Sequence, residues 1–213
     1  MYYVTCYGFF VVHGDDSRYN NSMYKKTIQT KRENAKNKLL NSLTPIIESG
    51  EYGGMTIRDI CASIGVTTGL FYRHFNSKNE ALAAWLVQEM REYIDHYTEK
   101  NEEGSMEEQI LRFCRDVAVI SKKGGPEMMT AFMEKGEPQS ACSVIRDLFA
   151  GQIEKIIAES GRLLSQERAA ESIASDITVI VKGLSYEFYT QGKEYDLVGE
   201  TERILRMVIP TLL

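Results

Sequence analysis

Residues 56–75 read Thr56-Ile57-Arg58-Asp59-Ile60-Cys61-Ala62-Ser63-Ile64-Gly65-Val66-Thr67-Thr68-Gly69-Leu70-Phe71-Tyr72-Arg73-His74-Phe75, and this stretch decides the fold. A threonine followed by an aspartate three residues later is a capping-box pattern that begins one short helix. Gly65 ends that helix, and Thr67 or Thr68 caps a second one. Apolar side chains on both helices supply a small shared core. Two short helices joined at a tight turn predict a helix-turn-helix, whose second helix enters the major groove of DNA.

The stretch and the residues after it resemble the DNA-binding segment of the TetR family of bacterial repressors. The resemblance is carried by Tyr72-x-His74-Phe75 and by Asn76-Ser77-Lys78-x-Glu80-Ala81-Leu82, with a further local match at Tyr195-Asp196-Leu197. It implies an all-α fold of about nine helices, with an N-terminal three-helix DNA-binding domain before a helical-bundle domain for ligand binding and dimerisation. The absence of any alternating strand pattern after residue 22 favours the same fold class.

Three parts are expected along the chain: an N-terminal extension over residues 1–22, a helix-turn-helix domain over residues 23–78, and an effector-binding and dimerisation domain over residues 79–213. Residues 2–12 are aromatic and β-branched, which favours a strand, and we predict no function for the extension. Met23 would make a sensible initiator. The first helix is expected from about Thr30 to Ser49, with an interruption at Pro45.

Composition and charge are those of an ordinary globular protein that has one basic segment. Of the 213 residues, 43% are apolar and 26% are charged, and the net charge is −5. Residues 23–78 nevertheless contain nine Lys and Arg against four Asp and Glu, whereas residues 79–213 contain fifteen against twenty-four. A basic segment attracts phosphate, although charge alone fits a chance cluster of solvated lysines equally well. The motif favours the first interpretation.

Several classes of function find no support in the sequence. The cysteines and histidines are scattered, which predicts free thiols in a reducing, cytoplasmic compartment and no metal site or cofactor: Cys6, Cys61, Cys114, Cys142, His13, His74 and His96. No Gly-rich phosphate loop, GxSxG or HExxH pattern occurs, so we do not expect an enzyme. No segment has the length of a membrane span, so no membrane partner is expected.

The expected partner is double-stranded DNA carrying a palindromic operator. The resemblance implies that Tyr72, His74 and Lys78 contact phosphates, and such contacts set the register without reading sequence. Arg58 matches a position that reaches a guanine or a phosphate. Arg73 is either a further phosphate contact or a solvated charge. Tyr72 has an alternative role as a half-buried core aromatic.

Base edges are expected to face four residues at the start of the second helix. The resemblance places Thr67, Thr68 and Leu70 toward the bases. Threonine hydroxyls bond to any base, and methyl and leucine groups suit the thymine methyl. Gly69 would let the backbone approach the DNA closely.

The chain is expected to form a homodimer through its last two predicted helices. Two half-sites one DNA turn apart need two recognition helices related by a two-fold axis. Their apolar residues recur at helical spacing, although the same faces could pack within one chain. The residues assigned to this interface are Ile173, Ile177, Ile180, Leu184, Phe188, Leu205, Val208, Ile209 and Leu212.

The resemblance also implies a cavity for a small, partly apolar effector in the C-terminal domain. Methionines adapt to irregular apolar ligands, although an aromatic and methionine stripe is more often plain core. The assigned lining residues are Phe113, Met129, Phe132, Met133, Phe149, Tyr186 and Tyr189.

The sequence therefore predicts a ligand-responsive, sequence-specific transcriptional repressor. One alternative is a constitutive DNA-binding or architectural protein of the same fold that senses no ligand, and a less favoured one is an all-helical enzyme. An apolar cavity of a few hundred Å³ in the C-terminal domain would favour sensing, whereas a solid core would favour the constitutive alternative.

Overall fold

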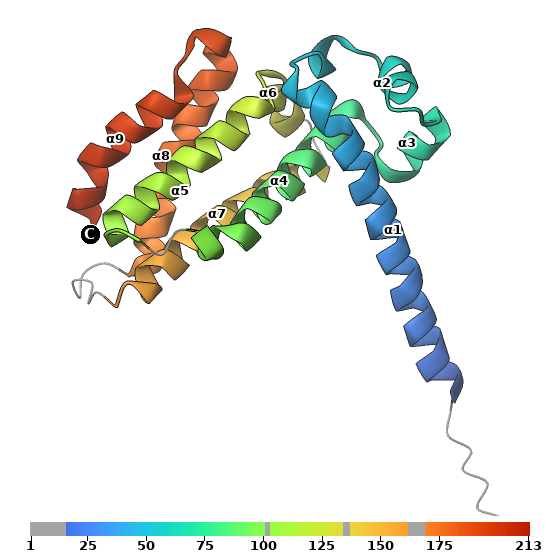
Figure 1. Cartoon of the computed structure of the whole chain (residues 1–213), viewed down its shortest axis with the longest axis horizontal. Helices are drawn as coiled ribbons and strands as arrows, with labels where there is room; N and C mark the ends of the chain where they lie inside the picture. The colour runs from blue at the N-terminus through green and yellow to red at the C-terminus, as the bar shows by residue number, and fades with distance from the viewer. Residues whose placement is uncertain (1–15, 101–102, 134–136, 162–168) are drawn as a thin grey trace, which may run out of the picture. The chain divides into compact units, whose positions relative to one another are not determined.

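The computed structural model describes residues 16–100, 103–133, 137–161 and 169–213, and within these ranges the backbone is helical or loop, without a strand. The elements are α1 Asp16–Glu48, η1 Tyr52–Gly54, α2 Ile57–Ser63, α3 Thr68–His74, α4 Lys78–Lys100, α5 Met106–Lys123, α6 Glu127–Met133, α7 Glu137–Glu159, α8 Ala170–Gln191, η2 Gly192–Glu194 and α9 Leu197–Leu212 (Figure 1). The predicted all-α class is confirmed. The strand expected over residues 2–12 lies outside the described residues.

Helix α1 differs from the prediction at its start and at its proline. It begins at Asp16 rather than near Thr30, because residues 16–29 contain neither Gly nor Pro and nothing in them ends a helix. It also continues through Pro45 to Glu48. The proline lacks the N–H that would bond to the Asn41 carbonyl, so it removes one bond of the helix without ending it. Residues up to Lys38 form a unit of their own.

Residues 39–213 form the second compact unit, which contains both the helix-turn-helix and the C-terminal helices. One cluster of buried side chains runs through it, from Leu43 of α1 and Phe71 of α3, through Trp85 of α4, to Ile177 of α8 and Leu205 of α9. The domain boundary predicted at residue 78 falls at the start of α4, whose own residues belong to this cluster. That boundary remains a prediction.

The helices that follow α3 pack against one another in the C-terminal part of the chain. Helix α5 packs against α9, while α7 packs against α4 and against α8 (Figure 1). Helix α5 begins at a capping box, in which the Ser105 hydroxyl accepts the Glu108 N–H at 3.2 Å and the Glu108 carboxylate accepts the Ser105 N–H at 2.8 Å. Its apolar face buries Ile110, Phe113 and Val117.

Three chemical features of the described residues bear on function. No helix among them is long and apolar enough to cross a membrane. No group of His, Cys, Asp and Glu side chains in these ranges is placed to hold a metal ion. The thiols of Cys61, Cys114 and Cys142 are free.

Candidate functional site

The geometry of the helix-turn-helix begins at two caps and a left-handed glycine. The Thr56 hydroxyl accepts the Asp59 N–H at 3.2 Å, and the Asp59 carboxylate accepts the Thr56 N–H at 3.2 Å. The hydrogen bonds from Thr56 lower the pKa of Asp59. Gly65 has a φ of 69°, in the region that favours glycine. The N–H of Val66 bonds to the Cys61 carbonyl and that of Gly65 to the Ala62 carbonyl, which is a Schellman motif.

Helix α3 is anchored by aromatic side chains on one face and exposed on the other. Phe71 and Phe75 are fully buried, with ring centroids 5.5 Å apart. The Thr67 hydroxyl accepts the Leu70 N–H at 3.2 Å and caps the helix. The exposed residues are Thr67, Thr68, Gly69, Leu70, Tyr72 and Arg73. The structure therefore brings most of the predicted DNA-contacting residues together on one solvent-facing surface, which we call the α3 face.

Three residues of the predicted contact set need separate description. The Tyr72 side chain is 55% exposed, so it is not a core aromatic, and its ring meets Phe71 edge-on at 5.9 Å. His74 is half-buried at the end of α3, while Arg58 is exposed on α2. A Cβ added to Gly69 would meet only the Thr67 hydroxyl, at 4.0 Å, so the protein's own packing does not require glycine there.

Lys78 does not fit the predicted role as a phosphate contact. Its ammonium donates to the carbonyls of Tyr52 at 3.2 Å, Gly53 at 2.7 Å and Met55 at 3.0 Å. It also lies 5.6 Å from the centroid of the Tyr52 ring, and the Tyr52 hydroxyl donates to the Lys78 carbonyl at 2.8 Å. An ammonium has three donors, and here all three are used within the chain. Lys78 is a structural clamp between η1 and α4.

Two contacts connect the helix-turn-helix to the C-terminal helices. The Trp85 indole N–H of α4 donates to the Thr44 hydroxyl of α1 at 3.0 Å. The Lys123 ammonium at the end of α5 lies 2.8 Å from a Glu48 carboxylate oxygen and 3.8 Å from one of Glu89. Burial raises the pKa of Glu89, and its hydrogen bond to Glu48 raises that of Lys123. Helices α1, α4 and α5 are thus joined by charge and hydrogen bonding as well as by apolar packing.

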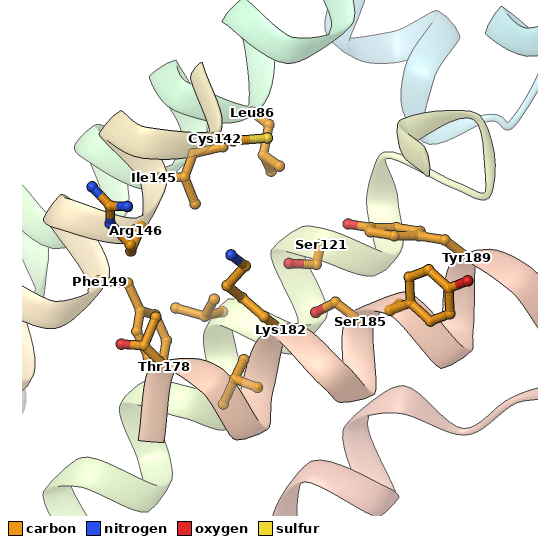
Figure 2. Close-up of a pocket in the computed structure, with 13 residues that line it drawn as sticks. Leu86, Ser121, Cys142, Ile145, Arg146, Phe149, Thr178, Lys182, Ser185 and Tyr189 are labelled. Atoms are coloured by element: carbon orange, nitrogen blue, oxygen red, sulfur yellow. The ribbon is translucent and has the colours of Figure 1, made fainter. Parts of the chain in front are cut away.

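A cavity of about 230 Å³ lies among α4, α5, α7 and α8 (Figure 2). Its walls are mostly apolar, with a few polar groups contributed mainly by α8. The lining residues are Leu86, Val117, Ser121, Cys142, Ile145, Arg146, Phe149, Thr178, Val181, Lys182, Ser185, Tyr186 and Tyr189.

The residues predicted to line a cavity divide into three groups. Phe149, Tyr186 and Tyr189 do line it. Phe113 does not: it is fully buried, and its ring packs against those of Tyr93, Tyr97 and Phe149 at centroid distances of 5.9, 5.3 and 5.1 Å. The side chains of Met129, Phe132 and Met133 lie outside the described residues. The aromatic and methionine pattern therefore identified part of the wall and misassigned one core residue.

Sequence reasoning missed most of the α8 wall. The lining residues of α8 that share one face of the helix lie three, four, seven and eleven positions after the first: Thr178, Val181, Lys182, Ser185 and Tyr189. The available signal was hydroxyl and ammonium groups repeated beside the core stripe of an otherwise apolar helix. The Leu86 and Val117 contributions carried no such signal, because each looks like any other core residue.

The predicted dimer interface also needs correction. Six of its residues are buried in the chain's own core, which helical spacing alone cannot distinguish from an interface: Ile173, Ile177, Leu184, Phe188, Leu205 and Ile209. Ile180, Val208 and Leu212 are half-buried. The apolar side chains that α8 and α9 expose are Val179 at 67%, Tyr186 at 52% and Met207 at 57%.

The fold and the α3 face define a class: a helical protein with an N-terminal helix-turn-helix. Residues 46–84 match the model of the family described as bacterial regulatory proteins, tetR family. This match covers α2, α3 and the start of α4. Residues 46–84 are therefore similar to the helix-turn-helix segment of that family, and the resemblance predicted from the motif is confirmed. A search of the curated proteins gives no match.

Over most of the chain, the fold is similar to those of solved transcriptional regulators. The crystal structure of FadR from Bacillus subtilis, in complex with stearoyl-CoA, has a TM-score of 0.61 at 15% identity and covers 79% of this chain and 95% of its own. A TetR-family regulator from Rhodococcus sp. has a TM-score of 0.58 at 20% identity, with coverages of 85% and 98%. One from Mesorhizobium loti has 0.58 at 14% identity, with coverages of 85% and 96%. At these identities the likeness is one of fold.

Proposed function

We propose that this protein is a homodimeric, sequence-specific DNA-binding repressor that a small molecule releases from its operator, without enzymatic activity. The observation that carries the proposal is the α3 face. Six consecutive or near-consecutive residues from Thr67 to Arg73 face solvent, while Phe71 and Phe75 fix the helix from behind. A short helix anchored in this way is the geometry by which a recognition helix enters the major groove. Such a regulator would act in the cytoplasm, where bacterial DNA lies.

The chemistry of the α3 face matches DNA recognition. Tyr72 and Arg73 present a hydroxyl and a guanidinium to solvent, and both groups suit phosphate oxygens. Thr67, Thr68 and Leu70 offer hydroxyls and methyl groups to base edges. The open space beside Gly69 admits a close approach of the DNA backbone. Phosphate contact thus rests on Tyr72, Arg73 and Arg58, and no longer on Lys78.

A homodimer follows from how such a protein reads DNA. Two recognition helices must enter successive major grooves roughly 34 Å apart, which requires a two-fold pair of chains. The exposed apolar side chains of α8 and α9, Val179, Tyr186 and Met207, together with the exposed Gly183, are the surface we assign to this pairing. They replace the buried residues that the sequence pattern suggested.

The cavity supports effector sensing over the constitutive alternative. Leu86 contributes to its wall from α4, and the preceding residue, Trp85, bonds to Thr44 of α1. A ligand that shifts α4 therefore acts directly on a contact to the DNA-binding helices. The dimer would then leave its operator by a population shift between two spacings of its recognition helices. The structurally similar FadR binds stearoyl-CoA, which supports a small-molecule effector here as well.

The test is a mobility shift with DNA from the gene's own upstream region. Tyr72→Ala should weaken binding to all sequences by about tenfold and reduce the salt dependence, because it removes a phosphate contact. Leu70→Ala should instead change the preference among operator variants. Arg91→Gln, an exposed charge on α4 outside the α3 face, serves as the control. Wild-type affinity and salt dependence in the Tyr72 variant would contradict the proposal.

A further inference from the structure

The polar groups of the cavity differ in whether the protein itself already uses them. The Tyr189 hydroxyl is hydrogen-bonded to Ser121, and burial raises its pKa. The Thr178 hydroxyl donates to the Ala174 carbonyl at 2.6 Å. The Arg146 guanidinium donates to one Asp147 carboxylate oxygen, from Nε at 3.0 Å and from Nη2 at 2.9 Å. These three hydroxyls and the guanidinium have partners within the chain, so a ligand would have to compete with a partner to bind any of them.

Lys182 and Ser185 are different. Within the described part of the chain, neither the Lys182 ammonium nor the Ser185 hydroxyl has a hydrogen bond or ion pair. The residues three and four positions from Lys182 along α8 are Thr178, Val179, Ser185 and Tyr186, so no carboxylate lies where a helical ion pair would form. Figure 2 shows the two side chains next to each other on α8, with the Lys182 nitrogen extended toward the middle of the cavity.

The charges of the lining residues also favour a ligand with an anionic group. Its thirteen residues include two cations and no carboxylate, and Asp147 already neutralises Arg146. Lys182 is exposed and Ser185 half-buried, so the apolar wall carries one ammonium without a counter-ion and one hydroxyl at its solvent-exposed edge. This arrangement matches a molecule that is apolar along its length and anionic at one end. A cationic ligand would meet repulsion there. A neutral apolar one would leave the ammonium unused.

The volume limits the size of such a molecule. A cavity of about 150 Å³ in another protein holds benzene, and this cavity is about 230 Å³. By proportion to the six non-hydrogen atoms of benzene, it accommodates a ligand of about nine non-hydrogen atoms. Medium-chain and aryl carboxylates such as octanoate and phenylpropionate are close to this size.

We infer that the cavity binds a small amphipathic carboxylate, whose apolar part lies against Leu86, Val117 and Phe149 and whose carboxylate is held by the Lys182 ammonium and the Ser185 hydroxyl. The inference rests on the proposed function only in taking this cavity as the effector site. Binding of the carboxylate can be measured without DNA, so this inference and the DNA-binding proposal are tested independently.

Isothermal titration calorimetry of the full chain with octanoate, octanol and octylamine tests the inference. Octanoate should bind at least ten times more tightly than octanol, and octylamine should bind most weakly. Lys182→Met should remove this preference by weakening octanoate at least tenfold while leaving octanol unchanged. Lys182→Arg should restore the preference, and Ser185→Ala should weaken octanoate by a smaller factor. Lys155→Met, on α7 outside the lining, is the matched control.

A second readout comes from Cys142, which also lines the cavity. Burial raises the pKa of its thiol, and the charge of Lys182 opposes that shift. Bound octanoate should therefore slow the modification of Cys142 by a maleimide in a chain that carries Cys6→Ser. Equal affinities for octanoate and octanol, wild-type octanoate binding by the Lys182→Met variant, or an unprotected Cys142 at saturating octanoate would each overturn the inference. A mobility shift that still shows operator binding would then leave the DNA-binding proposal intact.

Discussion

At the scale of single residues, the same side-chain type serves structure in one place and solvent-facing chemistry in another. Lys78 belongs to a motif whose lysine was expected on phosphate, yet its ammonium joins three carbonyls of η1 and the following residue. Lys182 lacks any such partner in the described residues and extends toward a cavity. Residue identity and spacing do not distinguish these two cases, because the difference lies in which carbonyls the folded chain brings near each ammonium.

The structural role of Lys78 leads to a first prediction. Lys78→Met should lower the free energy of unfolding by about 1–3 kcal/mol, since it leaves buried or half-buried carbonyls without a donor. Urea denaturation measures this loss. At temperatures where the variant remains folded, the slope of log affinity for DNA against log salt should match the wild type. A slope reduced by about one unit would instead place Lys78 on a phosphate.

Thiol reactivity gives a second prediction at this scale. Cys114 is buried and burial raises its pKa, so its thiolate population at neutral pH is small. Cys61 is also buried, whereas Cys142 is half-buried and opens on the cavity. In a chain with Cys6→Ser, a maleimide should therefore label Cys142 first, as read by mass spectrometry of proteolytic fragments. Faster labelling of Cys114 than of Cys142 would contradict the packing around α5.

At the scale of elements, two glycines of the helix-turn-helix have opposite roles. Gly65 has open space around it but a φ of 69°, so its glycine is needed for backbone conformation. Gly69 has ordinary helical backbone and open space, so the fold does not need it. A substitution at Gly65 should therefore affect folding, whereas one at Gly69 should affect DNA binding.

This contrast gives a third prediction. Gly65→Ala should lower the free energy of unfolding by about 1–2 kcal/mol, the cost of placing a Cβ in the left-handed region. Gly69→Ala should keep or slightly raise stability, because alanine favours helix over glycine by about 1 kcal/mol. Thermal denaturation compares the two. The Gly69 variant should nevertheless bind operator DNA more weakly, and unchanged binding would show that the backbone does not approach DNA there.

The elements also show how far sequence reasoning reaches. Caps at Thr56 and Thr67 and the turn at Gly65 were predictable, because they depend on local chemistry within a few residues. The start of α1 was not, because a polar stretch without Gly or Pro gives no clear stop signal. The cavity wall of α8 and the exposed face of the same helix were not either. Both depend on which side of an apolar helix its neighbours cover, and a single periodic pattern does not specify that.

At the scale of the whole molecule, the cavity and the proposed dimer surface share a side chain. Tyr186 lines the cavity and is also 52% exposed, and we assign it to the dimer surface. Thr178, Lys182 and Ser185 approach the cavity from the same helix that bears Val179 and Gly183. A ligand that changes the rotamer of Tyr186 would therefore act on the pairing surface as well as on α4. A bound effector would thus change the spacing of the two recognition helices both through α4 and through the dimer surface.

The dimer surface itself supplies the last prediction. Val179 is 67% exposed and Met207 57% exposed, so a charge at either position should leave the fold of one chain intact. In a dimer it would bury an unpaired carboxylate, which is costly. Val179→Asp should therefore shift sedimentation equilibrium from dimer to monomer, whereas Val119→Asp, at an exposed valine of α5, should not. Operator affinity should fall with the dimer, because one recognition helix reads only half of a two-fold site. A Val179→Asp chain that remains dimeric at micromolar concentration would move the interface to another face of the molecule.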